Sequence, residues 1–147
     1  MPDHLLNLQQ KIKTGIPLSE AMQFNIAELT ENLILVQAPL APNINVHGTG
    51  FAGSIYSVAV LSGWALCTHI MDMRGMKGDL VVASAEIKYR APVKGEIVCR
   101  SEVSEAHSAE FYDNFRDRGK GRLCLTVEVG DAPEAVLEGV YYAVEVA

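Results

Sequence analysis

The apolar positions of the first 22 residues follow helical spacing. Leu5, Leu8 and Ile12 recur at steps of three and four residues, as on one face of an α-helix. Pro17 fits the first turn of a second, shorter helix, because proline lacks the N–H that a first turn leaves unpaired. The pattern therefore predicts N-terminal helices within residues 1–22.

A second helical segment lies near the middle of the chain and is apolar on almost every face. Residues 54–74 contain no proline, and side chains such as Val58 and Leu66 leave only isolated polar positions between them. A helix that is apolar all round is buried in a core. Arg74 and Gly75 supply a cation and a stop signal at its end. A long, buried central helix is therefore predicted.

Much of the remaining chain alternates between apolar and polar residues, which is the spacing of a β-strand with one buried face. Before the middle of the chain, residues 24–37 are predicted to be extended, with a bend at Asn32. Period-two segments follow the central helix at residues 85–93, 97–103, 123–129 and 136–146. We expect five or six strands in an antiparallel sheet wrapped around the central helix, so the fold class is α+β.

Length and composition fit one folded domain over residues 1–147. The chain has 147 residues and is 49% apolar and 20% charged, which is enough to build a core without disulfides or metals. Its net charge of −6 excludes the broad basic surface of a nucleic-acid-binding protein. Because one sheet on one helix leaves a sheet edge open, we expect a homodimer or a dimer of dimers.

Other features point to a cytoplasmic protein. No segment offers about 18 uninterrupted apolar residues for a membrane span, and the first residues lack a basic leader followed by an apolar core. Cys67, Cys99 and Cys124 are odd in number and widely spaced, so we expect reduced, buried thiols. The histidines are too far apart for metal-ligand spacing, and neither a metal nor another cofactor is expected.

A turn rich in proline, asparagine and glycine, APNINVHGTGFAGS at residues 41–54, precedes the central helix. GTGFAG within it matches the dinucleotide pattern G-x-G-x-x-G, but no acidic residue stands at the end of a following strand, so a nicotinamide site is not expected. A glycine-rich turn still leaves unpaired backbone N–H groups at the positive end of a helix, where an anion or a developing oxyanion can bind. The alternative is a purely structural turn.

Two further groups of side chains are candidates for chemistry. His47 stands just before the glycines, either as a structural loop histidine or as a functional one. No serine lies in a G-x-S-x-G nucleophile elbow, so a serine hydrolase is not expected. Four of the twelve basic residues fall within seven positions, which suggests either a solvated hairpin turn or an anchor for phosphates or an acidic carrier. These residues are Arg116, Arg118, Lys120 and Arg122.

Together these features resemble a hotdog-fold protein of the acyl-thioester family. The resemblance covers nearly the whole chain and is carried by NINVHGTGFAGSIY at residues 43–56 and LSGW at residues 61–64. These motifs are similar to a subgroup of bacterial thioesterase-like proteins that also occur fused behind an acetyltransferase domain. The resemblance implies an α+β hotdog fold, an obligate dimer and an acyl thioester of coenzyme A or acyl carrier protein as the substrate.

The resemblance also implies roles for individual residues. Many hotdog thioesterases have an asparagine before a Gly-Thr-Leu-His-Gly-Gly turn and an acidic residue within the central helix. Aligning the turns puts Asn45 at the asparagine position, Phe51 at the histidine position and Val60 near the acidic position. Because no carboxylate lies between Ser54 and Met71, the usual hydrolytic acid is missing.

Some members of this subgroup decarboxylate malonyl–acyl carrier protein to prime fatty acid synthesis, and this is the expected reaction. Decarboxylation needs no general base but needs the enolate oxygen stabilised, which the resemblance assigns to the N–H groups of Gly53 and Ser54. Asn45 would orient the substrate, and His47 or Tyr56 would support it. Asn43, Thr49 and Phe51 are implied to contact the substrate. The alternatives are a thioesterase and a non-catalytic acyl-thioester binding protein.

Overall fold

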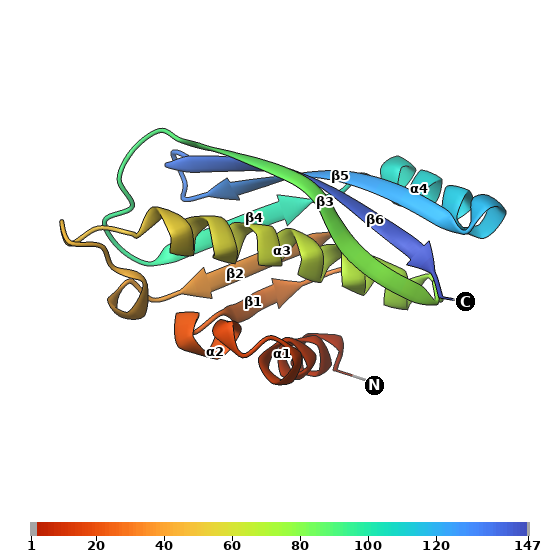
Figure 1. The fold of residues 1–147 in the computed structure, drawn as a ribbon, viewed down its shortest axis with the longest axis horizontal. Coiled ribbons are helices and arrows are strands. Elements are labelled where there is room, and N and C mark those ends of the chain that lie inside the picture. Colours follow the sequence, from red (N-terminus) through yellow and green to blue (C-terminus); the bar gives the residue numbers. More distant parts are fainter. Residues whose placement is uncertain (1–2, 147) are drawn as a thin grey trace.

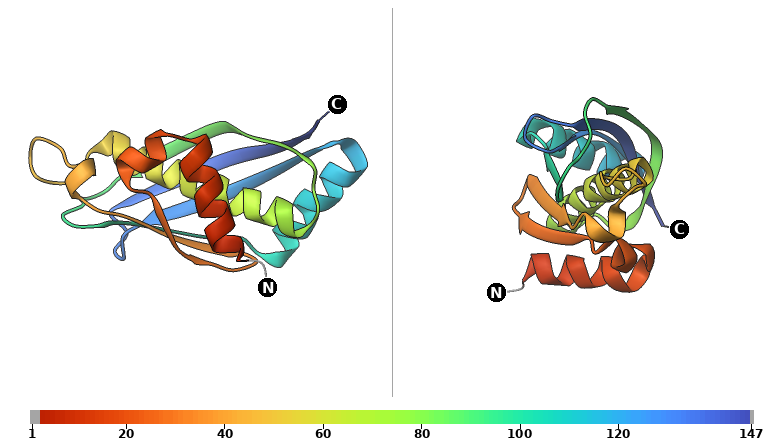
Figure 2. Two further views of the ribbon diagram at one scale, coloured as in Figure 1. Left: turned by 90° about the horizontal axis from the view of Figure 1, so that it is seen from below. Right: turned by 90° about the vertical axis from the view of Figure 1, so that its left-hand side faces the viewer.

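A computed structural model describes residues 3–146, so residues 1, 2 and 147 of the expected ranges lie outside the described part. A six-stranded antiparallel sheet, in the order β1-β2-β4-β5-β6-β3, curves around one long helix, α3 (Figures 1 and 2). The strands are β1 (Asn25–Leu29), β2 (Leu33–Ala38), β3 (Gly78–Tyr89), β4 (Ile97–Glu102), β5 (Lys120–Val129) and β6 (Ala135–Glu145). The helices are α1 (His4–Gly15), α2 (Leu18–Met22), the 3-10 turn η1 (Ala41–Asn43), α3 (Ala52–Met73) and α4 (Glu105–Arg118).

Helix α3 is the centre of the core, which confirms the predicted buried helix. Val58, Leu66 and Ile70 are at most 1% exposed and face the concave side of the sheet. By length and composition alone α3 could cross a membrane, but 72% of its most apolar stretch is buried inside this protein, as in the core helix of a soluble fold. The helix begins two residues before the expected start, because Phe51 already has the extended conformation of an N-cap.

Strand β5 shows how the period-two pattern builds the sheet. Leu123, Leu125, Val127 and Val129 face the core, as the alternation predicts, and the residues between them are exposed. Cys124 is one of the exposed residues, so the expectation of three buried thiols is wrong at that position. Cys67 and Cys99 are buried, and burial raises the pKa of the Cys99 thiol to about 12.

Strand β3 begins and ends earlier than the expected segment at residues 85–93. It begins at Gly78 rather than at residue 85, because the stretch from 78 to 84 pairs with β6 although its residues do not alternate. It ends at Tyr89, just before Arg90, Ala91 and Pro92. Because β3 is the last strand of the sheet, one side of its backbone has no strand neighbour among the described residues.

Helix α4 is absent from the sequence-based expectation, which gave only strands after α3. The Ser104 hydroxyl accepts a hydrogen bond from the His107 backbone N–H (3.1 Å) and caps the helix start, and Gly119 ends the helix with a φ of +73°. The interpretation of the four cations as a hairpin turn is therefore wrong. Arg116 and Arg118 lie in the last turn of α4, and the other two begin β5.

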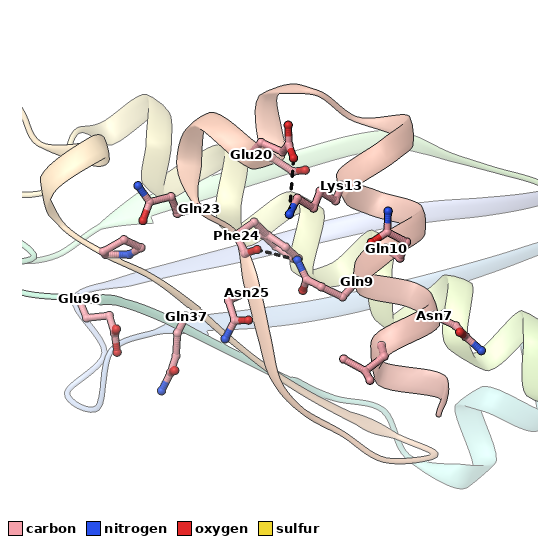
Figure 3. A pocket seen from close by; sticks show the side chains of 13 residues that line it. Asn7, Gln9, Gln10, Lys13, Glu20, Gln23, Phe24, Asn25, Gln37 and Glu96 are labelled. Atoms are coloured by element: carbon pink, nitrogen blue, oxygen red, sulfur yellow. Dashed lines mark hydrogen bonds and ion pairs between the residues drawn. The ribbon is translucent and has the colours of Figure 1, made fainter. Parts of the chain in front are cut away.

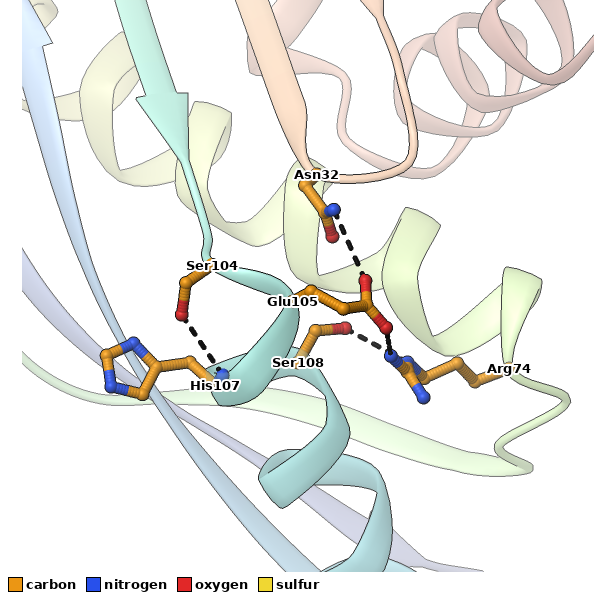
Figure 4. Close-up of polar contacts among 6 residues, drawn as sticks. All are labelled: Asn32, Arg74, Ser104, Glu105, His107 and Ser108. Atoms are coloured by element: carbon orange, nitrogen blue, oxygen red, sulfur yellow. Dashed lines mark hydrogen bonds and ion pairs between the residues drawn. The ribbon is translucent and has the colours of Figure 1, made fainter.

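Polar contacts tie the end of α3 to the start of α4 (Figure 4). Arg74 donates from Nη2 to Oε1 of Glu105 (2.6 Å) and from Nε to the hydroxyl of buried Ser108 (3.0 Å). The other carboxylate oxygen of Glu105 accepts from Nδ2 of Asn32 in the β1–β2 turn (3.4 Å). Three elements far apart in the sequence are thereby joined at one end of the molecule.

Candidate active site at the start of the central helix

The glycine-rich turn lies at one end of the long axis, between η1 and the first turn of α3 (Figure 1). Asn45 holds the turn together. Its Oδ1 accepts from the backbone N–H groups of His47 (2.8 Å) and Thr49 (3.1 Å), and its Nδ2 donates to Oγ1 of Thr49 (2.9 Å) and to the carbonyl of Gly50 (3.1 Å). All of its hydrogen-bonding capacity is used within the turn, so Asn45 acts on its surroundings through the shape of the turn.

Asn43, another predicted contact residue, lies beneath this turn and is 1% exposed. Its Nδ2 donates to the carbonyls of Met22 (2.9 Å) and Pro39 (2.9 Å), and its own carbonyl accepts from the N–H of Phe51 (2.8 Å). Asn43 thereby joins α2, β2 and the start of α3. Its Oδ1 is buried and has no partner among the residues that the structure describes.

The start of α3 presents backbone donors. The first helical hydrogen bond runs from the N–H of Ile55 to the carbonyl of Phe51 (2.9 Å), so the N–H groups of Ala52, Gly53 and Ser54 precede the hydrogen-bonded ladder. Within residues 3–146 no side chain caps this end. The Phe51 ring folds so near Gly53 that a Cβ there would lie 2.6 Å from the ring edge. The two predicted oxyanion donors therefore stand at the positive end of a 22-residue helix.

Two tyrosines flank this helix start. Tyr56 is half-buried on α3, and the Tyr89 hydroxyl at the end of β3 donates to the carbonyl of Ala52 (2.8 Å). Burial raises the pKa of Tyr89, and the nearby phenol of Tyr56 adds to the shift. Sequence reasoning selected Tyr56 but missed Tyr89. The only available signal was that Tyr89 occurs on the expected inner face of a strand.

The other predicted side chains of the turn differ in exposure. His47 is exposed, and only its backbone N–H is held, by Asn45. Thr49 is half-buried and its hydroxyl accepts from Asn45. Phe51 is 51% exposed, which is unusual for a large apolar side chain at a turn. Among the predicted side chains of this turn, His47 and Phe51 are therefore the ones that a ligand can reach most easily.

The basic residues lie at the opposite end of the long axis (Figures 1 and 2). Helix α3 has 22 residues, so about 33 Å separates its two ends. Arg116 is also paired with Asp113 (3.5 Å) and Asp117 (2.9 Å), which offsets its charge. Lys120 stacks its ammonium over the Tyr142 ring, 4.6 Å from the centroid. Within one chain, these cations and the glycine-rich turn do not form one site.

Two hollows in the surface were not foreseen from the sequence. One, of about 910 Å³, lies between α1, α2, β1 and β2 and is lined mainly by polar side chains, many of them amides (Figure 3). There Gln9 donates to the carbonyl of Phe24 and accepts from the N–H of Ile26, both at 2.8 Å, and so completes the free edge of β1. The other, of about 240 Å³, is almost entirely apolar and lies beside α3. In the described part of the chain, no group of three His, Cys, Asp or Glu side chains could hold a metal ion.

Solved structures similar to this chain share its fold. A protein from Shewanella oneidensis described as a "putative thioesterase" is 34% identical, with 98% of this chain and 99% of that chain covered and a TM-score of 0.87. A protein of unknown function from Chlorobaculum tepidum is 28% identical, with coverage of 95% and 93% and a TM-score of 0.92. The PaaI protein of the Escherichia coli phenylacetic acid degradation operon, at 12% identity, coverage of 96% and 94%, and a TM-score of 0.68, is similar in fold alone.

These similarities agree with the architecture, and the expected α+β hotdog fold is confirmed. A family profile described as "Putative thioesterase (yiiD_Cterm)" matches residues 5–145, which is nearly the whole chain. The resemblance drawn from residues 43–56 and 61–64 is thereby confirmed at the level of a hotdog-fold, thioesterase-type family. The chain belongs to this "putative thioesterase" family.

Proposed function

We propose that the protein hydrolyses acyl thioesters at the start of α3. The observation that carries this proposal is the set of unpaired N–H groups at Gly53 and Ser54, at the positive end of a buried helix and one helical turn before Ser57, which lines an apolar hollow. Such donors stabilise the negative charge that develops on a thioester oxygen when its carbonyl carbon is attacked. Membership of a thioesterase-type family supports the same chemistry.

In this reaction a water molecule attacks the carbonyl carbon and gives a tetrahedral oxyanion held by Gly53 and Ser54. When the oxyanion collapses, the C–S bond breaks, the thiol leaves and a carboxylic acid remains. His47 is the candidate base that takes the proton from water and returns it to the departing thiolate, because its exposed imidazole adjoins the turn. Thr49 and Tyr56 are candidates to orient the thioester through their hydroxyl groups.

Decarboxylation of a malonyl thioester is the second candidate. It is favoured by the absence of any carboxylate between Ser54 and Met71, since a carboxylate there would repel the substrate. The bond between the carboxylate and the α-carbon would break, CO₂ would leave, and the N–H groups of Gly53 and Ser54 would hold the enolate oxygen. Protonation of the enolate by solvent would give the acetyl thioester.

We also propose a homodimer that pairs β3 of one chain antiparallel with β3 of the partner. Val81 and Val82 are 49% and 42% exposed on this open edge, which is typical of a strand that pairs with another chain. In each chain, Tyr89 at the C-terminal end of β3 contacts the start of α3, and Gly78 at the N-terminal end of β3 pairs with Glu145, beside the start of β5. An antiparallel pair would therefore bring the partner's Lys120 region toward the glycine-rich turn, where it could bind the phosphates of coenzyme A or an acidic carrier.

Intact mass spectrometry of acyl thioesters separates these reactions. Octanoyl-coenzyme A and malonyl–acyl carrier protein are incubated with the wild type, with Asn45→Ala, and with Asn7→Ala as a control at an exposed position on α1. Release of the free thiol by the wild type and the control, but not by Asn45→Ala, supports hydrolysis. Loss of CO₂ with the thioester intact supports decarboxylation instead. Bound substrate without any product would overturn both and leave a binding protein.

A further inference from the structure

We propose that the apolar hollow beside α3, here called the acyl groove, binds the acyl chain of the substrate and that Trp64 limits the chain length. This inference rests on the proposed function, because it extends the same site. The groove has a volume of about 240 Å³. Its lining residues come from the segment joining α1 and α2, from α2, from α3 and from β3, and are Ile16, Leu18, Met22, Ser57, Val60, Leu61, Trp64 and Val82.

The floor of the acyl groove leads directly from the candidate active site. Ser57, Val60, Leu61 and Trp64 follow the spacing i, i+3, i+4 and i+7, so they form a single stripe along α3. Gly53, one turn before Ser57, begins the same stripe. A thioester whose oxygen contacts the N–H groups at the helix start can therefore extend its acyl chain along this stripe.

The chemistry of the lining selects an apolar ligand. Ser57 has the only polar hydroxyl among the lining side chains, and none of them is charged. A carboxylate at the far end of a ligand would lose its water there without gaining a partner, which is costly. An alkyl chain replaces water without such a cost. The acyl groove therefore fits an alkyl chain rather than a malonyl group.

Trp64 forms the far end of the stripe and is held in place. Its indole Nε1 donates to the carbonyl of Leu80 on β3 (3.2 Å), which fixes the ring beside the sheet edge. From Gly53 to Trp64 the helix rises by about 16 Å, which is much longer than an acetyl group and suits a chain of medium length. A longer chain would have to displace the indole and break its hydrogen bond.

Because the chain contains a single tryptophan, Trp64 also reports whether the acyl groove is occupied. We would titrate the protein with S-ethyl, S-octyl and S-hexadecyl coenzyme A, thioethers that cannot be hydrolysed, and record tryptophan emission. The S-octyl compound is expected to shift the emission at concentrations at least tenfold lower than those at which the S-ethyl compound does. Equal responses to all three compounds, or none, would overturn the proposal even for an active thioesterase.

Two variants test where the acyl chain of the substrate lies. Val60→Phe fills the acyl groove and is expected to abolish the response to the S-octyl compound, whereas Leu6→Phe, which introduces the same residue at a 61% exposed site on α1, retains it. Trp64→Ala, assayed by turnover, is expected to move the preference from octanoyl- to palmitoyl-coenzyme A. An unchanged preference, or equal effects of the two phenylalanine variants, would contradict the proposal. A normal emission response without turnover would instead refute the proposed function and leave the binding site standing.

Discussion

Asn45 shows how one side chain can matter for catalysis without touching the substrate. Asn45→Ala removes four hydrogen bonds inside the turn. We expect a net loss of about 1 kcal/mol in the free energy of unfolding, because water compensates such bonds in part, and hence a midpoint about 3 °C lower. Turnover should fall more than tenfold, because the turn shapes the start of α3.

Asn45→Asp is the matched control, since it keeps the acceptor for the N–H groups of His47 and Thr49 and loses only the two donors. It should therefore lie between the wild type and Asn45→Ala in both thermal midpoint and kcat/KM. Wild-type turnover in Asn45→Ala would show that the shape of the turn is not needed.

Gly63 is required by a close approach inside the core. A Cβ at this position would lie 2.7 Å from Cζ of Tyr141 and nearer still to its hydroxyl, which donates to the carbonyl of Val60 (2.9 Å). Gly63→Ala should therefore lower the free energy of unfolding by about 1–3 kcal/mol, although alanine normally favours a helix over glycine. Denaturation in urea measures this loss.

The double variant of Gly63→Ala with Tyr141→Phe tests the cause. Removing the hydroxyl relieves the closest overlap and leaves that with the ring carbon, so the double variant should be less destabilised than the sum of the single variants. Additive losses in the free energy of unfolding would mean that another neighbour opposes the alanine.

At the scale of elements, α4 shows where sequence analysis fell short and why. The sequence does contain the signals of this helix. They are a cap at Ser104, a stop at Gly119 and the helical spacing of Ser108, Phe111, Tyr112 and Phe115. However, only Ser108 and Phe111 of this helix are buried, so its apolar stripe is too short to stand out. The alternation of β5 was unambiguous because every second residue faces the core.

The cap of α4 can be tested without disturbing the candidate site. Ser104→Ala removes the acceptor of the His107 N–H, and we expect it to cost about 1 kcal/mol in the free energy of unfolding. Ser104→Asp should retain stability, because aspartate accepts the same bond and its charge suits a helix start. Calorimetry checks both, and thioester turnover should be unchanged. Equal midpoints for all three proteins would show that the cap contributes nothing measurable.

The docking of α1 onto α3 involves a buried histidine whose pKa the fold lowers. His69 is 5% exposed, and its ring lies 5.6 Å from that of His4 in an edge-on arrangement. Burial lowers the pKa of His69, and the charge of His4 lowers it further, whereas Asp72 and Glu31 raise it by less. The unfolded chain therefore binds a proton at His69 more readily than the folded protein does.

Stability from His69 should thus be fully present above its unfolded pKa of about 6.5 and be lost as the pH falls below that value. Thermal midpoints measured from about pH 8 to about pH 5 should fall less steeply for His69→Gln than for the wild type. His107→Gln, at an exposed position on α4, serves as the control. Parallel pH profiles for the wild type and His69→Gln would contradict this expectation.

For the whole molecule, the sequence predicts the layers better than it predicts the site. The central helix and the strand pattern follow from periodicity, and the turn follows from Pro, Asn and Gly. The acyl groove could not be predicted, because it joins Leu18, Val60 and Val82, which only the tertiary fold brings together. For the same reason the sequence could not show that the basic residues and the turn lie at opposite ends of the long axis of the molecule.

Because Lys120 and the glycine-rich turn of one chain lie far apart, the proposed contact of Lys120 with a carrier bound at the turn requires the proposed dimer. Val81→Lys puts a charge on the open edge of β3 and should give a monomer of 16.0 kDa by light scattering, whereas Val81→Thr should remain dimeric. In the dimer, Lys120→Glu should raise KM for an acyl-carrier-protein thioester several-fold through lost charge attraction, with little change in kcat.

In the Val81→Lys background, the Lys120→Glu change should have no such effect on KM, because Lys120 and the turn of its own chain lie at opposite ends of the long axis of the molecule. The two changes together would then raise KM by less than the product of their separate effects. If Lys120→Glu weakened the carrier substrate equally in monomer and dimer, the cation would act within one chain, and the antiparallel pairing of β3 would lose its functional argument.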